Sequence, residues 1–399
     1  MNRSAKDIAM NREMLNMMER KFLPVGQGAF YCEKFYFAEW GTKLNVIYDC
    51  GSSTDLKIVQ GKIKENFEKG ETIEALIISH LDEDHINGIQ YLLQYCTVKK
   101  IYFPLISSQN SALMKIGFEI RKCDPFVVEF LNNPLGAINS LQLEYEPIFV
   151  QIREHEDEGY SSFDMANSIP SGQNLMNDII NANKKHISGL LYDWEYIPYN
   201  FRQADRIRRL MDALRGEFQR QDIKINEIEE LWRNGGDSDR KKIKAAYKKV
   251  PGSFNTNSMV LFSGIRHTYC YQTVACPCRC ICSCNSCRYM RFCCKEQVSG
   301  CLYMGDYDAA GKNKWMQLKK AYRMYWDSIG CVQVPHHGSK HNFNPKLLEF
   351  RCIYVISAGF SNRYRHPHAS VVKQFLFNHV MPYIVTEKDE SELVTFVNL

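Results

Sequence analysis

The sequence predicts a layered α/β fold, in which strands and helices alternate along the chain. Apolar runs such as Ile73–Ser79 and Lys100–Pro104 have the length of buried strands, and segments of helical spacing such as Ile58–Phe67 and Ile86–Tyr95 lie between them. In addition, several of the apolar runs are followed immediately by polar residues that can bind metal. Functional sites of α/β proteins commonly form where strands end in this way.

The composition is that of a large folded chain without a membrane segment. Of its 399 residues, 45% are apolar, which is enough to bury one big domain or two ordinary ones. No run approaches the ~18 apolar residues that span a bilayer, and Met1–Lys21 lacks the apolar stretch of a signal peptide. We therefore expect a cytoplasmic protein. Its net charge of +5 permits a polyanionic partner without establishing one.

The first part of the chain contains the clearest alternation of elements. Residues 1–21 are predicted to form an N-terminal helix, mainly over Lys6–Arg20. Residues 22–106 follow as the first half of the fold, beginning with two strands and a turn in Phe22–Tyr36 and Leu44–Tyr48. The buried strand Ile73–Ser79 then leads directly to the polar stretch that begins at His80.

The pattern changes in the middle of the chain. Residues 107–250 contain mostly amphipathic helical stretches, apart from a strand near 190–198, and we interpret them as an insertion. The second half of the fold is predicted in 251–399. Within it, the cysteine-rich stretch 264–301 takes the place of a tight hairpin turn between two strands.

The strongest chemical signal is the turn that follows the strand Ile73–Ser79. Within six residues it holds four side chains that can bind a metal, namely His80, Asp82, Asp84 and His85. In a strand-to-helix turn, alternate residues can converge on one point. The alternative is that Asp84 only caps the helix that begins near His85.

Three later strand ends also carry metal-binding residue types. They are Gly305-Asp306, Pro335-His336-His337-Gly338-Ser339 and Asn362-Arg363-Tyr364-Arg365-His366-Pro367-His368. Adjacent histidines are often only surface residues. Because four strand ends all bear histidine or aspartate, we interpret them instead as parts of one metal site.

Taken in order, these motifs resemble the metallo-β-lactamase domain of ComEC-type DNA-uptake proteins. The stretch His80 to Gly88 is similar to the first metal motif of that family, and the three later strand ends follow in the family's order. Its opening and middle motifs resemble Val25-Gly26-Gln27-Gly28, Asp49-Cys50-Gly51 and Asn255-Thr256-Asn257-Ser258. The resemblance implies a metallo-β-lactamase αββα sandwich, here with a helical insertion and a cysteine-rich hairpin insertion. The membrane-spanning part of the competence proteins is absent.

The resemblance also implies a two-metal site and assigns its ligands. His80 and Asp82 would hold one metal, Asp84 and His85 the other, and Asp306 would bridge them. His337, or its neighbour His336, would complete the second metal. Many family enzymes have a further histidine ligand between the first motif and the Gly-Asp motif, for which this sequence offers no clear match and His155 and His186 are candidates.

Asp82 stands where many members of the family have histidine. Three carboxylates then face two dications. Because carboxylate oxygens are hard ligands, the expected metal preference of the site shifts from Zn²⁺ toward Mn²⁺. The shift is modest because Zn²⁺ also accepts carboxylate ligands.

The expected reaction is hydrolysis by a hydroxide generated at two metal ions. We predict catalytic roles for Asp84, His336 and His366, because a histidine not bound to metal can contact phosphate or protonate the leaving oxygen. A nuclease is the first interpretation. The alternatives are a small-molecule phosphodiesterase, similar to phosphorylcholine esterase, and a metal-bearing sensor or scaffold with little activity.

A nucleic-acid partner depends on the basic stretches of 107–250. The predicted contacts to the phosphate backbone are Lys241, Lys242, Lys244, Lys248 and Lys249. Acidic residues and glutamines are interleaved with the basic ones, so a solvated helix face is an equal alternative. The sequence does not identify a protein partner.

The cysteine-rich stretch is a second candidate metal site. Most of the 16 cysteines fall in it, at the Cys-x-Cys and Cys-x-x-Cys spacings that suit Zn²⁺. The predicted ligands are Cys276, Cys278, Cys280, Cys282, Cys284, Cys287, Cys293 and Cys294. The alternatives are an iron–sulfur cluster and a hairpin that is disulfide-linked or merely reduced.

Overall fold

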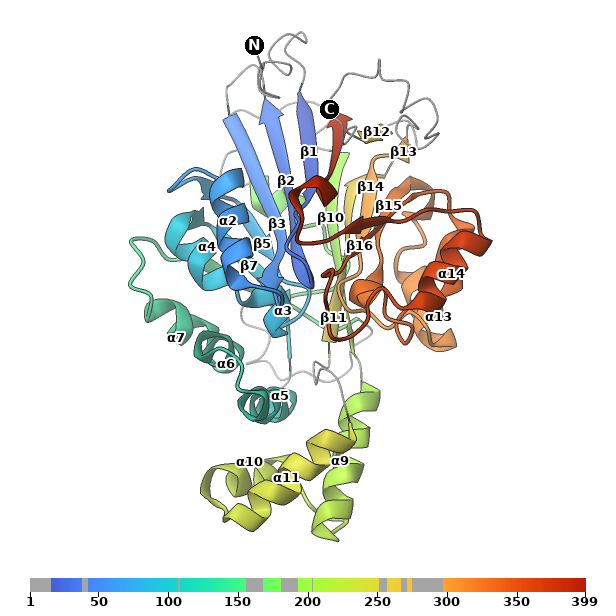
Figure 1. Ribbon diagram of the computed structural model, residues 1–399. Coiled ribbons are helices and arrows are strands. Elements are labelled where there is room, and N and C mark those ends of the chain that lie inside the picture. The colour runs from blue at the N-terminus through green and yellow to red at the C-terminus, as the bar shows by residue number, and fades with distance from the viewer. Residues whose placement is uncertain are drawn as a thin grey trace.

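Two β-sheets face each other in the computed structural model, and helices cover their outer faces (Figure 1). The described residues are 16–37, 42–106, 108–155, 168–180, 193–202, 204–250, 257–266, 271–274 and 297–399. The predicted α/β fold is confirmed in this arrangement. The predicted cysteine ligands 276–294, together with His186, Asn255 and Thr256, lie outside the described residues.

The first sheet has the strand order β13-β12-β18-β1-β2-β3-β5-β7-β8-β9. Its strands are β1 (Met17–Phe22), β2 (Gly28–Phe37), β3 (Thr42–Ser52), β5 (Ala75–Ile77), β7 (Lys100–Pro104), β8 (Ile148–Ile152), β9 (Ser168–Ile169), β12 (Tyr271–Val274), β13 (Gln297–Val298) and β18 (Leu393–Asn398). From β3 to β9 neighbouring strands are parallel, so their carboxyl ends lie at one edge. A separate pair joins β4 (Thr72–Ile73) to β6 (Thr97–Val98).

The second sheet has the order β10-β11-β14-β15-β16-β17. Its strands are β10 (Trp194–Arg202), β11 (Asn257–Ile265), β14 (Gly300–Tyr303), β15 (Ile329–Gln333), β16 (Ile353–Ser357) and β17 (Tyr383–Val385). The last four are parallel. Their carboxyl ends therefore also share an edge, and the loops that follow β14, β15 and β16 start close together.

Helices flank the sandwich and extend beyond one end of it (Figure 1). The first sheet is covered by α2 (Leu56–Asn66), α3 (Glu83–Ile86) and α4 (Ile89–Tyr95), and the second by α13 (Lys312–Ala321) and α14 (Ala369–Phe377). The middle of the chain adds α5 (Ser108–Arg121), α6 (Pro125–Asn132), α7 (Pro134–Asn139), α8 (Met176–Ile180), α9 (Ala204–Phe218), α10 (Ile225–Asn234) and α11 (Asp237–Lys249). Short 3₁₀ turns are η3 (Trp326–Ser328), η4 (Pro335–Gly338), η5 (Pro345–Glu349) and η6 (Asp389–Ser391).

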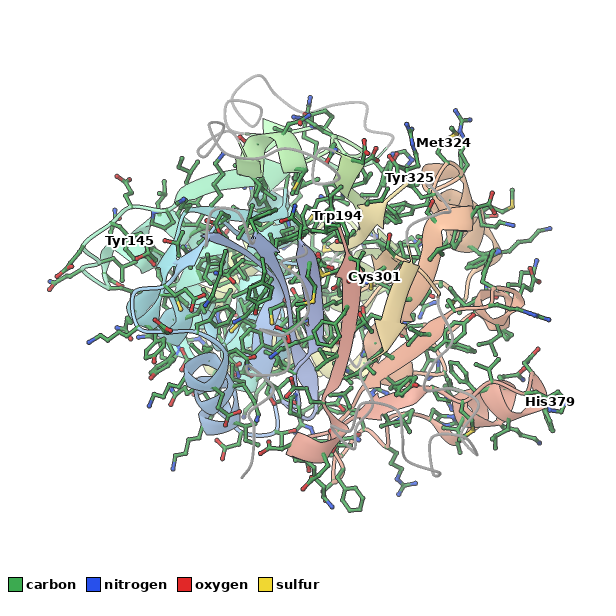
Figure 2. The ribbon with its side chains drawn as sticks, turned by 90° about the horizontal axis from the view of Figure 1, so that it is seen from above. Tyr145, Trp194, Cys301, Met324, Tyr325 and His379 are labelled. Atoms are coloured by element: carbon green, nitrogen blue, oxygen red, sulfur yellow. The ribbon has the colours of Figure 1, made fainter. Side chains whose placement is uncertain are left out.

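The apolar side chains form three layers of core, as an αββα sandwich requires. One lies between the two sheets, and one lies under the helices on each outer face. Trp194 and Cys301 are fully buried in the middle layer, whereas Met324 and His379 lie at the periphery (Figure 2). Burial of these layers supplies the main stabilisation of the fold.

A buried ion pair joins the two sheets within the middle layer. Arg20 on β1 donates from Nε to Glu33 on β2 across 2.7 Å, and it donates further to the carbonyls of Ser263 and Ser299. Glu33 also accepts from the hydroxyls of Tyr196 and Tyr303, at 2.6 and 2.9 Å. Since these bonds satisfy both charged groups, the pair is tolerated away from water.

Two predictions about elements need correction. The helix predicted mainly over Lys6–Arg20 is wrong at its carboxyl end, because Met17–Phe22 forms β1 with alternate residues buried. Pairing with β18 from the far end of the chain stabilises this strand, and local spacing could not show that partner. The segment 107–250, expected to be mostly helical with a strand near 190–198, also contains β8 and β9, which continue the first sheet.

The remaining elements agree better with the pattern. The strand expected near 190–198 is β10, and Lys100–Pro104 is a strand as predicted. The interpretation of 107–250 and 264–301 as insertions stays a prediction. Among the described residues, no helix is both long and apolar enough to cross a membrane.

Candidate metal centre

Strands of both sheets deliver the predicted metal ligands to one place. The turn containing His80 and His85 follows β5, Asp306 follows β14, and His337 follows β15. A hydrogen bond of 2.8 Å from the Met259 amide to the Ser79 carbonyl joins the sheets beside this turn. Residues far apart in the sequence therefore meet because the two sheet edges face each other.

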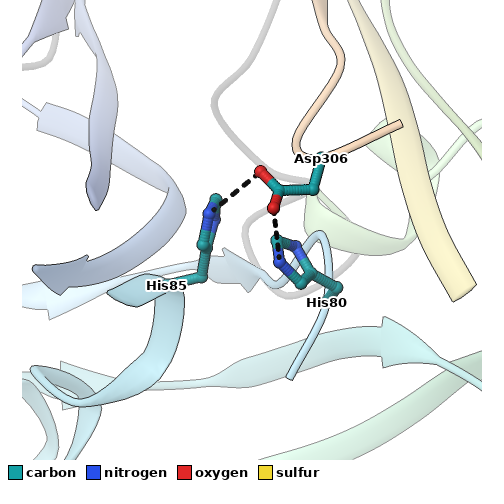
Figure 3. Close-up of side chains that lie close together, drawn as sticks. All are labelled: His80, His85 and Asp306. Atoms are coloured by element: carbon teal, nitrogen blue, oxygen red, sulfur yellow. Dashed lines mark ion pairs between the residues drawn. The ribbon is translucent and has the colours of Figure 1, made fainter. Parts of the chain in front are cut away.

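Asp306 lies between two histidines of the first motif. Its Oδ2 is 3.6 Å from Nε2 of His80, and its Oδ1 is 3.4 Å from Nε2 of His85 (Figure 3). The ligand atoms of these three residues all lie within 4.8 Å of one another. One carboxylate oxygen thus faces each imidazole, and the bridging role of Asp306 stays a prediction.

A second group of possible ligands shares His85 with the first. Its other members are Asp84 and His337, and the ligand atoms again lie within 4.8 Å of one another. Oδ2 of Asp84 is 3.3 Å from Nε2 of His337. Asp82 belongs to neither group, although its Oδ2 lies 3.6 Å from Nε2 of His80. The assignment of His80 and Asp82 to one metal and of Asp84 and His85 to the other stays a prediction.

Each of these histidines is held through Nδ1, which leaves Nε2 directed at the site. His85 Nδ1 donates to Asp49 across 2.8 Å, and His337 Nδ1 donates to the Ser357 carbonyl, also across 2.8 Å. His80 Nδ1 lies 2.8 Å from the hydroxyl of Ser79. Contacts made by the ring nitrogen that does not bind the metal fix the tautomer and orientation of metal-binding histidines.

The inward atoms of the site are buried without hydrogen-bond partners. They are Nε2 of His80, His85 and His337, Oδ1 of Asp82 and Oδ1 of Asp306. Leaving so many polar atoms unsatisfied in one place costs about 1–3 kcal/mol each. Imidazole and carboxylate donors are ligands of Zn²⁺ and Mn²⁺, and bound ions would satisfy these atoms, so the residues fit the implied metals.

Close backbone packing holds the first motif in position. A Cβ on Gly51, at the end of β3, would lie 2.7 Å from the carbonyl carbon of Asp84 and 2.6 Å from that of His85. Only glycine permits this approach. The motif Asp49-Cys50-Gly51 therefore supports the site twice, through the Asp49 carboxylate and through the missing side chain of Gly51.

Electrostatics couple the histidines to the carboxylates. Burial and the neighbouring His85 lower the pKa of His80, but the carboxylates of Asp306 and Asp82 outweigh them and raise it to about 9. For Asp306, burial raises the pKa, yet His336 and His80 hold it well below its usual range. Without metal, protonated imidazoles thus balance the carboxylates, and a dication would compete with those protons.

The other predicted histidines differ in their distance from the centre. His336 Nδ1 lies 3.3 Å from Oδ2 of Asp306, so this residue is at the site. The ring of His366 is 5.6 Å from that of His336 and 6.2 Å from that of His337. His155 instead packs edge-on against Tyr199 at 4.7 Å and belongs to neither ligand group.

The predicted lysine contacts lie on α11, away from the metal centre. Lys241, Lys244, Lys248 and Lys249 are exposed, and Lys242 is partly buried. Several of these side chains have neighbours within the helical unit. Lys249 pairs with Glu217 at 2.6 Å, and Lys242 lies 5.1 Å above the ring of Phe218.

Two neighbours of the site were given no role by the sequence. Asp49 orients His85, and its signal was an aspartate at the end of a predicted strand. Arg121, at the end of α5, lies 3.7 Å from Oδ1 of Asp82. No local pattern marks Arg121, because only the packing of α5 against the first motif brings it there.

Residues 35–160 match the model of the metallo-beta-lactamase superfamily. Solved structures similar to this chain include unliganded yeast PDE1, with 8% identity, a TM-score of 0.43 and coverage of 96% of this chain and 100% of that one. A diphosphatase of the PhnP family has 7% identity, a TM-score of 0.33 and coverage of 93% and 87%. MEM-A1, a subclass B3 metallo-beta-lactamase from a soil metagenome library, has 10% identity, a TM-score of 0.29 and coverage of 80% and 79%.

Comparison with curated proteins finds no match. The narrower resemblance to ComEC-type proteins stays a prediction. The matched segment 35–160 contains the whole His80 to His85 motif, and the two-sheet architecture agrees with it. The match to the metallo-beta-lactamase superfamily therefore concerns residues 35–160, and the chain as a whole has a mixed α/β fold of two facing sheets.

Proposed function

We propose that the chain is a metal-dependent hydrolase of phosphodiesters and that its substrate is nucleic acid. The observation that supports this most directly is the convergence of Nε2 of His80, His85 and His337 around Asp306 and Asp84. Bound divalent ions would supply Lewis acidity there, which lowers the pKa of water toward neutrality and neutralises phosphoryl oxygens.

His366 is suited to contact phosphate as a neutral donor. Burial, with the charges of His337 and His336, lowers its pKa to about 4, so the ring is uncharged at neutral pH. The amide Nε2 of Gln27 lies 3.4 Å from its Nδ1, which favours the tautomer with the proton on Nε2. That N–H can donate to a phosphoryl oxygen. Protonation of the leaving oxygen falls instead to His336, which is 23% exposed beside Asp306.

The position of α9, α10 and α11 favours a polymeric substrate. These helices stand beyond the end of the sandwich at which α3 lies, so they are at the same end as the first metal motif (Figure 1). The exposed lysines of α11 would extend the contact to phosphates distant from the scissile one. The ion pair of Lys249 with Glu217 favours the second candidate, a small-molecule phosphodiesterase, because it leaves less positive charge on α11 for a ligand.

The hydrolase proposal is tested by coupling metal content to turnover. Wild type and the double variant Asp84→Ala, Asp306→Ala are stripped with chelator, reloaded with Mn²⁺ or Zn²⁺, and assayed on bis(p-nitrophenyl) phosphate. We expect the folded double variant to lose both bound metal and hydrolysis. A folded double variant that keeps its metal would place the ions elsewhere, and metal-loaded wild type without turnover on any diester would favour a sensor or scaffold.

The choice between nucleic acid and a small diester depends on the lysines. Changing Lys241, Lys242, Lys244, Lys248 and Lys249 to glutamine should weaken DNA binding and reduce its salt dependence in proportion to the number of phosphates that the lysines neutralise in wild type. Hydrolysis of bis(p-nitrophenyl) phosphate should be retained. If the variant cleaves DNA and RNA as wild type does at every salt concentration, the small-molecule assignment is favoured.

A further inference from the structure

Arg121 places a guanidinium beside the first metal motif from outside that motif. Its Nη2 is 3.7 Å from Oδ1 of Asp82, and the side chain is 37% exposed. The turn after α5 is itself tied to the motif, since the Asp124 amide donates to Glu83 across 3.2 Å. Arg121 therefore has a defined position at the edge of the site together with a face open to solvent.

A second guanidinium, that of Arg363, lies in the loop after β16, two residues before Arg365 and next to Tyr364. Arg363 donates to the hydroxyl of Tyr364 across 2.7 Å and stacks on its ring, with Cζ 4.9 Å from the ring centroid. This hydrogen bond raises the pKa of Arg363, on which the charges of Arg121 and Asp84 also act. Arg121 thus lies beside Asp82, and Arg363 lies on the ring of Tyr364.

The ring of Tyr364 begins a series of rings that leads to the metal centre. It is 49% exposed and stacks on His366, with centroids 5.9 Å apart and planes 23° apart. His366 in turn stacks on His337 at 6.2 Å and 24°. Asn362 braces this loop by accepting from the His366 amide and donating to the His366 carbonyl, at 2.8 and 2.6 Å. An aromatic group lying on Tyr364 would therefore be next to the reacting phosphate.

We infer that Arg121 and Arg363 bind the phosphate of the substrate and that Tyr364 stacks on an aromatic ring attached to it, as in a nucleotide. Guanidinium groups pair with phosphate oxygens in a bidentate manner, and base–aromatic stacking tolerates any base sequence. This inference rests on the proposed function and specifies its substrate class. It assigns recognition to the end of α5 and to the loop after β16, which contribute no predicted metal ligand, although that loop holds the predicted catalytic residue His366.

Binding of two phosphates that differ only in the base tests the stacking. Thymidine 5′-monophosphate and deoxyribose 5-phosphate are titrated calorimetrically into metal-loaded protein. Wild type should prefer the nucleotide by roughly 5- to 100-fold, and Tyr364→Ala should abolish the preference while Tyr364→Phe keeps it. The matched control is Phe377→Ala, because Phe377 is 65% exposed and also has a cation, Lys373, 5.2 Å from its ring. Equal affinities in wild type, or a preference that survives in Tyr364→Ala, would overturn the stacking.

The arginines are tested with the same two phosphates. Arg121→Gln and Arg363→Gln should each weaken both ligands about tenfold or more, and the exposed Arg233→Gln should weaken neither. Metal content is measured in parallel. If Arg121→Gln loses metal in proportion to its loss of phosphate affinity, Arg121 only supports Asp82, and its role in phosphate binding is wrong. These titrations do not depend on turnover, so absent hydrolysis would refute the proposed reaction while leaving the binding result intact.

Discussion

Asp49 accepts a hydrogen bond from Nδ1 of His85 across 2.8 Å, and both side chains are buried. Asp49 also accepts from the amide and the hydroxyl of Ser79, each across 2.7 Å. A single carboxylate thereby orients His85 and fixes the residue before His80. The two histidines that face Asp306 depend on it.

Loss of the Asp49 carboxylate should weaken metal binding without removing a predicted ligand. We expect Asp49→Ala to lower metal affinity about 10- to 100-fold, as changes to such supporting residues do. Metal titration with a competing chelator measures this. Asp327→Ala, at an exposed position, is the control. Unchanged affinity in a folded Asp49→Ala protein would show that His85 needs no orientation.

The stability of the metal-free protein should depend on pH through His80. The folded-state pKa of about 9 lies above the ordinary value of 6.5, so the protonated form is favoured by folding. Its contribution is complete below about pH 6.5 and is lost as the pH rises toward 9. The melting temperature of metal-free wild type should therefore fall over this interval, and that of His80→Asn should fall less.

Metal affinity should change in the opposite sense over the same interval. A dication must displace the His80 proton, so binding tightens as the pH rises. Calorimetry in buffers of different ionisation enthalpy would detect the released proton. A metal affinity that stays constant between pH 6.5 and 9 would mean that metal binding releases no proton from His80.

Asp82 should set the metal preference. A third carboxylate favours Mn²⁺ over Zn²⁺ for hydrolysis, and Asp82→His should move the preference toward Zn²⁺. Chelator-stripped protein reloaded with each ion allows the comparison. Faster hydrolysis with Zn²⁺ than with Mn²⁺ in wild type would contradict the argument that a third carboxylate favours Mn²⁺. The charge of Arg121, which lies 3.7 Å from Asp82, would then be changed next.

The buried pair Arg20–Glu33 should be important for stability. Glu33→Ala leaves the fully buried Arg20 without its carboxylate and should cost about 3–5 kcal/mol in the free energy of unfolding. Glu229→Ala breaks an exposed pair with Arg233 and should cost only about 0.2–0.5 kcal/mol. Urea denaturation compares the two. Similar costs would mean that the middle core layer tolerates an unpaired charge.

Local sequence determined the elements whose signal lies within a few residues. The apolar strand ending at Ser79, the polar turn from His80 to His85 and the histidine pair after β15 were all identifiable, because strand length and residue chemistry are local properties. Their order along the chain also indicated the fold. Local sequence did not predict the strand β1, because the conformation of this segment depends on pairing with β18.

Tertiary structure alone decided how the metal ligands are grouped and supported. His85 on α3 faces Asp306 as well as Asp84 and His337, and its ring is held by Asp49, which lies on β3. These relationships arise because two sheet edges face each other. The spacing of residues along the sequence does not show how close the two edges lie. The same holds for Arg121, which reaches Asp82 only because α5 packs against the first motif.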